Sequence, residues 1–114
     1  MKLKYVLSIC FLAIPVMMIG QKVFRVEYES QADIRVFVVE YESQCDLKVY
    51  FVDYDSQADE DGLWYFVKYE SQADKKLYFV DYESQADLKI YIVKYSSQAG
   101  WRNKKKQHLL LIGQ

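Results

Sequence analysis

The 114-residue sequence has little of several residue types on which small proteins and enzymes often depend. It contains one histidine, one proline, two cysteines and four glycines. Cys10 lies in an N-terminal segment that we expect to be removed, so Cys45 remains alone and no intramolecular disulfide can form. Stability must therefore come from packing. We expect Cys45 to be a small buried residue in place of the alanine that other repeats carry.

The first 20 residues have the layout of a secretory signal peptide. Lys2 and Lys4 precede an apolar stretch, 5–20, which ends in Gly20. This stretch is shorter than the roughly 20 residues that a membrane-spanning helix needs. We expect cleavage after Gly20, export through the inner membrane, and a mature domain, 21–114, that is periplasmic or secreted and has no stable membrane span. An uncleaved N-terminal anchor is the alternative.

The mature chain carries a small negative charge. Without Lys2 and Lys4, 13 basic residues face 16 acidic ones, which gives a net charge of −3. Nucleic-acid binding usually requires a basic face, so nucleic acid is not an expected partner. Protein and glycan partners both remain open. No cofactor is expected.

Six tandem copies of one unit fill the mature chain. A tyrosine followed by a polar turn recurs every 13 residues, with one longer step of 15 that contains Glu60 and Asp61. A fixed period of this kind predicts a repeated structural unit. The six anchor tyrosines are Tyr28, Tyr41, Tyr54, Tyr69, Tyr82 and Tyr95.

Each unit is predicted to be one β-strand plus one connection, which makes the fold class all-β. Side chains alternate with a period of two in segments such as 49–54, and β-branched and aromatic residues favour a pleated surface. We expect the face that carries the anchor tyrosine to lie in the core with its hydroxyl at the rim. The other face is apolar in its middle and charged at its end, and we expect two-sided burial of the central units.

The connections have the sequence Glu-Ser-Gln-Ala-Asp in most copies and contain no glycine or proline. They are therefore not two-residue hairpin turns. Ser and Asp side chains can instead bind nearby backbone and define a wider turn, so we expect the repeated Ser and Gln to be structural. A plain meander and an interleaved strand order both remain open. After the repeats, 107–112 is expected to form a terminal strand.

The repeated motif Y-[ED]-S-Q-[AC]-D, followed by strands such as LKVYFV, resembles the septoil (septafoil) knot domain family of small exported bacterial proteins. The segment Gly100-Trp101-Arg102-Asn103-Lys104 and the short apolar run after it are also similar to that family. The resemblance covers roughly 22–112. It implies a compact β fold threaded as a seven-crossing torus knot, which composition and spacing do not show, because knots are rare. It implies no activity.

Two binding sites are conceivable from single features. The acidic cluster Asp55, Asp59, Glu60 and Asp61 supplies the hard oxygen ligands that calcium prefers, although its spacing matches no regular calcium loop. A solvated acidic loop is the simpler interpretation.

Trp64 and Trp101 break the repeat pattern and are the candidates for a sugar-stacking surface. Packing in the core is the simpler interpretation of both side chains.

A noncatalytic structural or interaction module is the leading hypothesis, and a carbohydrate-binding or calcium-dependent module is the alternative. An enzyme comes third. It would have to use His108 or a repeated carboxylate pair such as Glu29 and Asp33. A pair that recurs in successive units is more typical of architecture than of a single catalytic centre.

Overall fold

The computed structural model describes residues 21–111, so the predicted signal peptide lies outside the described part of the chain. Strands and short 3-10 helices alternate along these residues. The strands are β1 (Lys22–Arg25), β2 (Ile34–Val38), β3 (Leu47–Phe51), β4 (Leu63–Phe66), β5 (Lys75–Phe79), β6 (Leu88–Ile92) and β7 (Gly100–Trp101). The 3-10 helices are η1 (Glu29–Gln31), η2 (Glu42–Gln44), η3 (Asp55–Gln57), η4 (Glu70–Gln72), η5 (Glu83–Gln85), η6 (Ser96–Gln98) and η7 (Lys104–Leu110).

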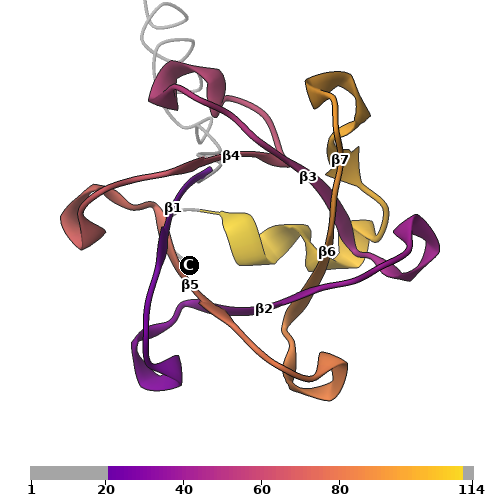
Figure 1. The fold of residues 1–114 in the computed structure, drawn as a ribbon, viewed down its shortest axis with the longest axis horizontal. Helices are drawn as coiled ribbons and strands as arrows, with labels where there is room; N and C mark the ends of the chain where they lie inside the picture. The colour runs from indigo at the N-terminus through magenta and orange to yellow at the C-terminus, as the bar shows by residue number, and fades with distance from the viewer. Residues whose placement is uncertain (1–20, 112–114) are drawn as a thin grey trace, which may run out of the picture.

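The first six strands form a closed parallel barrel. Their order is β4-β1-β5-β2-β6-β3, and a further pairing of β3 with β4 closes the ring. Figure 1 shows this ring with six connections radiating from it as arms. Except for β3 and β4, consecutive strands are not neighbours, so the strand order is interleaved and the meander is excluded. The prediction of an all-β repeat fold is confirmed.

Interleaving requires the chain to pass over a strand between two successive units. After β1, the backbone N–H of Val26 donates to the carbonyl of Leu77 on β5 at 2.8 Å. Six residues later the N–H of Asp33 donates to the carbonyl of Lys76 at 2.8 Å. Carbonyls of adjacent strand residues point to opposite edges, so the arm starts at one edge of β5 and ends at the other.

A repeated aspartate fastens each of these crossings. Its backbone N–H donates to the carbonyl of one residue on the crossed strand, and its carboxylate accepts a hydrogen bond from the N–H of that same residue. The bonds of Asp46 with Lys89, for example, measure 2.7 and 2.9 Å. We call these residues the crossing aspartates; with the residue that each one grips, they are Asp33 with Lys76, Asp46 with Lys89, Asp74 with Lys22 and Asp87 with Arg35.

The 15-residue step joins β3 to β4, which are direct neighbours and need no crossing. Gly62 lies at a φ of 91°, and the N–H of this glycine donates to the Gln21 side chain at 3.2 Å. A Cβ at Gly62 would lie 2.5 Å from the carbonyl oxygen of Lys48. The backbone of the insertion is therefore pressed against the neighbouring strand, at a position where only glycine fits.

The core does not include the anchor tyrosines. All six are 64–68% exposed, so the prediction that they line the core with only the hydroxyl at the rim is wrong. The barrel interior is filled instead by the first residues of each strand, such as Leu47 and Val49, which are fully buried. The tyrosine follows the strand and precedes a 3-10 helix on an arm, where the alternation of a strand no longer applies.

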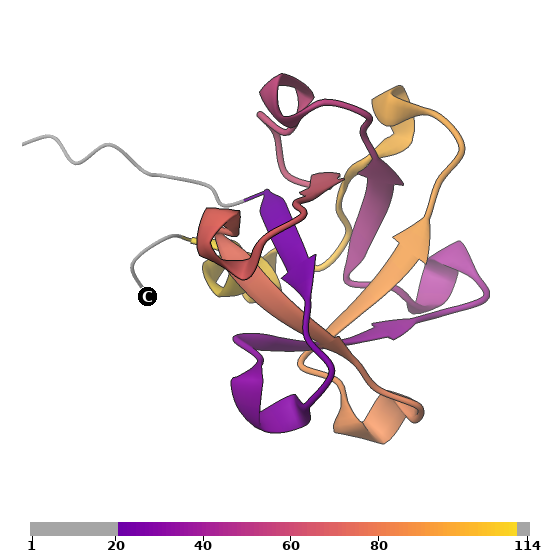
Figure 2. The same ribbon diagram turned by 60° about the vertical axis from the view of Figure 1, so that its left-hand side comes forward.

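The C-terminal segment plugs one end of the barrel. Helix η7 lies within the ring of strands in Figure 1 and at one end of the molecule in Figure 2, and its Leu110 is 1% exposed in the core. The terminal strand expected over 107–112 is therefore wrong for the described part of that segment. The Asn103 side chain accepts a hydrogen bond from the N–H of Lys105 and starts a helical turn there.

Candidate functional site: the open mouth of the barrel

The end of the barrel opposite η7 is lined by the last inward-facing residue of each strand. These residues pair in register with core residues: Phe79 pairs with Val36, and Phe51 pairs with Trp64. Parallel strands end at the same side of a barrel, so the six side chains form one ring. We call it the mouth ring; its members are Arg25, Val38, Phe51, Phe66, Phe79 and Ile92.

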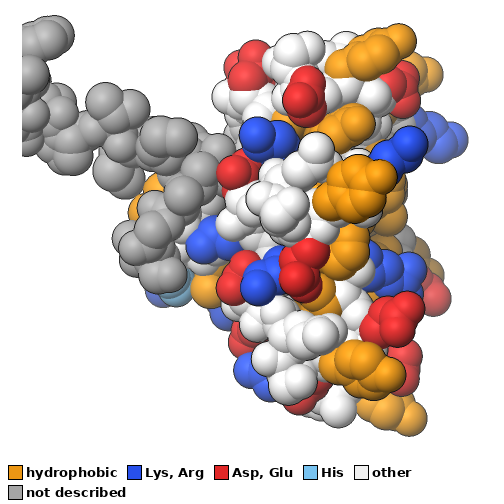
Figure 3. Space-filling view, turned by 90° about the vertical axis from the view of Figure 1, so that its left-hand side faces the viewer, with side chains coloured by type: hydrophobic (Ala, Val, Ile, Leu, Met, Phe, Trp, Pro, Cys, Tyr) orange, Lys and Arg blue, Asp and Glu red, His pale blue; other side chains and the backbone are white. Residues whose placement is uncertain are grey.

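The mouth ring is apolar and open to solvent. Phe51 and Phe66 are each 37% exposed, Val38 is 39% exposed and Ile92 is 41% exposed. The rings of Phe51 and Phe66 meet edge to face with centroids 5.1 Å apart, and the Arg25 guanidinium lies 5.0 Å from the centroid of Phe79. In Figure 3, orange hydrophobic side chains gather on the right-hand side, away from the end where η7 lies. Two-sided burial of the central units is therefore wrong at this position.

A charged residue follows the mouth ring by two positions in every unit. We call these six residues the rim charges; in the order of the strands around the barrel they are Lys68, Glu27, Asp81, Glu40, Lys94 and Asp53. All six are exposed. Strands β1, β5 and β2 are neighbours and all end in acids, whereas β6, β3 and β4 end in two lysines and one acid. The rim is therefore acidic on one half and basic on the other.

A groove of about 540 Å³ lies on the acidic half of the rim. It is lined by the guanidinium-bearing Arg25, the ring of Phe79, and the carboxylate residues Glu27 and Asp81. Further grooves lie between adjacent arms; one of about 330 Å³ includes Tyr28 of the first arm and Glu70 of the fourth. The exposed side chains at this end thus combine apolar contact area with charges of both signs, which is typical of an interaction surface.

Trp64 faces away from any surface. It is fully buried in the core, and its indole N–H has no hydrogen-bond partner within the described residues. Because β4 follows the two-residue insertion, the tryptophan takes an inward position that valine, leucine or isoleucine fills on the other strands. Burial therefore removes Trp64 from the candidate sugar-stacking surface.

Trp101 and Asp61 meet at a joint between the two ends of the described chain. The Asp61 carboxylate accepts hydrogen bonds from the Trp101 indole N–H and from the Gln21 side-chain amide. Trp101 is only partly exposed and packs against the core. A structural role for Trp101 and Asp61 accounts for these contacts.

The predicted calcium ligands do not come together. Asp55, Asp59 and Glu60 are exposed on the third arm, whereas Asp61 points to Trp101 and Gln21. Within residues 21–111, no three acidic, histidine or cysteine side chains form a group that could hold a metal ion.

The remaining reactive side chains lie near the plugged end. His108 is exposed on η7, with Nδ1 at 3.2 Å from the carbonyl oxygen of Lys105. Cys45 is 2% exposed, and burial raises the pKa of its thiol, which keeps it protonated rather than nucleophilic. His108 and Cys45 take no part in the mouth ring.

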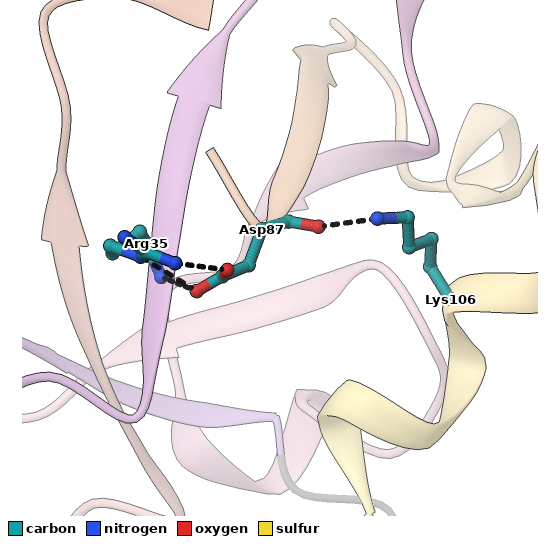
Figure 4. Close-up of polar contacts among 3 residues, drawn as sticks. All are labelled: Arg35, Asp87 and Lys106. Atoms are coloured by element: carbon teal, nitrogen blue, oxygen red, sulfur yellow. Dashed lines mark hydrogen bonds and ion pairs between the residues drawn. The ribbon is translucent and has the colours of Figure 1, made fainter. Parts of the chain in front are cut away.

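One crossing aspartate also forms an ion pair. The Asp87 carboxylate accepts bonds from both the Nε and an Nη of Arg35, at 3.2 and 2.9 Å, while the carbonyl of Asp87 accepts a bond from Lys106 Nζ at 3.0 Å (Figure 4). The hydrogen bond from Arg35 lowers the pKa of Asp87. These contacts join β2, the start of β6 and helix η7 on the plugged side of the barrel.

Two features were missed from the sequence. The repeated aspartate of the turn was treated as one half of a carboxylate pair, although its position immediately before each strand signals a contact with backbone. The mouth ring was read as the middle of a sheet face, although the charge two residues later marks the point where each strand leaves the barrel.

The family comparison agrees with this fold. The model of the 7(1) septoil knot domain matches residues 20–102. No curated protein and no solved structure matches the chain.

Proposed function

The chain belongs to the 7(1) septoil knot domain family, and we propose that within this fold it serves as a noncatalytic interaction module of an exported protein. The proposal rests on the mouth ring. Monomeric proteins rarely leave a contiguous cluster of large apolar side chains open to solvent without using it for contact. Here such a cluster stands at the end of a rigid barrel and is surrounded by charges that can orient a partner.

The framework behind the mouth ring supports a role outside the cytoplasm. The crossing aspartates fasten arms to strands that are far away in the sequence; the interval between Asp46 and Lys89 is typical. Such crossings must be undone before the chain can unfold, which slows unfolding and protects against proteases. Among the described residues, no helix is long and apolar enough to cross a membrane. Export by cleavage after Gly20 is part of this proposal.

Site-specific photo-crosslinking in cells tests the interaction role. A benzoylphenylalanine would replace Phe51, Phe66 or Ile92 at the mouth ring, and Lys104 or His108 on η7 as matched controls at the opposite end. We expect crosslinked species from the mouth positions and none from the controls. Crosslinks that are equally frequent at both ends, or absent from the mouth, would overturn the proposal.

A carbohydrate-binding module is the second candidate, because the six anchor tyrosines stand 64–68% exposed around the molecule. Tyrosine offers an apolar face with a polar handle, which suits sugar rings. A thermal-shift screen against a glycan panel tests it, since a ligand at 100 times its Kd adds about 2.7 kcal/mol of stability. Screening with calcium and then with a chelator tests the metal-dependent version in the same assay.

A further inference from the structure

The distribution of charge around the mouth identifies a partner. The acidic half of the rim carries Glu27, Asp81 and Glu40 on the neighbouring strands β1, β5 and β2. The opposite half carries Lys94 and Lys68, separated by Asp53. The arms accentuate this division, because the residue after the anchor tyrosine is acidic in the first five units and is Ser96 in the sixth. Arg25 and the two lysines keep the mouth from being uniformly negative.

A face with opposite charges on its two halves is complementary to itself. Rotation of a second copy by 180° about an axis in the plane of the mouth, perpendicular to the line from acidic to basic half, sets the two mouths against each other. The acidic half of each copy then faces the basic half of the other. This is the isologous contact of a two-fold symmetric dimer, in which one patch serves both partners.

We propose that the occupant of the mouth is a second copy of this chain, joined mouth to mouth in a two-fold dimer. The apolar mouth ring forms the centre, where Phe51, Phe66 and Ile92 lose contact with water. The rim charges form a surrounding belt that pairs Lys68 and Lys94 with Glu27 and Asp81 of the other copy. The inference rests on the proposed interaction role and names its partner.

The size of the surface sets the strength of the contact. The mouth ring and the rim together supply about 12 residues from each copy, fewer than the 20–30 residues of a standard stable interface. We therefore expect a weak dimer with a dissociation constant on the order of 10 µM. Salt screens exposed charge pairs, so the dimer should weaken as sodium chloride rises from about 50 to 500 mM.

Sedimentation of protein purified after expression of the full-length chain tests the dimer. We expect the average mass to rise from one copy toward two across the micromolar range. The double variants Lys68→Glu with Lys94→Glu, and Glu27→Lys with Asp81→Lys, each place like charges opposite one another. Each should weaken the dimer at least tenfold, and mixing the two variants should restore association as a mixed pair.

The control is Lys104→Glu with Lys105→Glu on η7, which changes the same charges at the plugged end and should leave the dimer intact. Circular dichroism verifies that every variant is folded. A wild-type protein that stays monomeric to about 1 mM, a dimer that survives both double variants, or a mixture that does not associate would overturn the second copy as partner. Crosslinks from Phe51 to a different protein would then leave the interaction role standing, whereas no crosslink and no dimer would remove both.

Discussion

Arg35 grips Asp87 at three points across one strand crossing: its backbone N–H, Nε and an Nη group all donate to the carboxylate, at 2.9, 3.2 and 2.9 Å. Asp87 lies immediately before β6, and Arg35 lies within β2. The hydrogen bonds from Arg35 lower the pKa of Asp87, and the carboxylate raises the pKa of Arg35. The crossing is therefore fastened more strongly while Asp87 is ionised.

Acid should weaken this crossing. A carboxyl group with a lowered pKa in the folded state contributes its full stabilisation above the unfolded pKa, about 3.9, and loses it as the pH falls through the folded pKa. Asp87→Asn should therefore be less stable than wild type near pH 6, and the difference should shrink toward pH 2. Urea unfolding across this range measures the difference.

Arg35→Leu supplies the reference for that experiment. In this background the arginine no longer lowers the pKa of Asp87, so adding Asp87→Asn should change the pH dependence less than it does in the wild type. An equal change in both backgrounds would contradict the role of the ion pair.

Asp46 should be the crossing aspartate whose loss costs the most stability. Its carboxylate is 5% exposed and accepts bonds from the Lys89 N–H at 2.9 Å and from the Asn103 amide at 3.0 Å. Replacement by alanine leaves two buried donors unpaired, which should cost about 3 kcal/mol. Asp33→Ala is the matched control, because Asp33 is exposed and accepts a single bond, from Lys76; about 1 kcal/mol is expected there. Denaturant titration measures both, and equal losses would contradict the difference.

The sequence was most informative about the repeated unit. The period of 13, the strand in each unit and the family resemblance all follow from side chains that recur at equivalent positions. The interleaved strand order does not follow from them, because it depends on hydrogen bonds such as that from Val26 to Leu77, which join residues far apart in the sequence. Local patterns are the same for a meander and for an interleaved barrel.

Burial was harder to predict than strand formation. Apolar residues lie on both faces of every strand, so alternation does not say which face is inside. Tyr54 and Phe51 both looked like core residues, yet one stands on an arm and the other at the open mouth. Leu110 has the pattern of a strand residue but occupies a helix that enters the barrel. Each position depends on where the chain leaves the barrel, which no short window of sequence records.

Gly62→Ala should be strongly destabilising. The new Cβ would lie 2.5 Å from the backbone oxygen of Lys48, and φ at this position is 91°. Strain from the backbone angle and overlap with a backbone atom should together cost about 3 kcal/mol. Gly100→Ala isolates the effect of the angle, because φ is also positive there but a Cβ would meet nothing within 4 Å. A loss of about 1–2 kcal/mol is expected at Gly100 by denaturant unfolding, and equal losses would show that the contact with Lys48 is unimportant.

Trp64 should tolerate phenylalanine but not alanine. The indole is fully buried and its N–H is unpaired within the described residues, so the native side chain carries an unsatisfied donor into the core. Trp64→Phe removes that donor and leaves a modest cavity, two effects that oppose each other, so the free energy of unfolding should stay within about 1 kcal/mol of wild type. Trp64→Ala leaves a much larger cavity beneath Phe51 and should cost about 4 kcal/mol. A phenylalanine variant as unstable as the alanine variant would mean that the indole N–H has a partner, and it would return Trp64 to consideration as a functional residue.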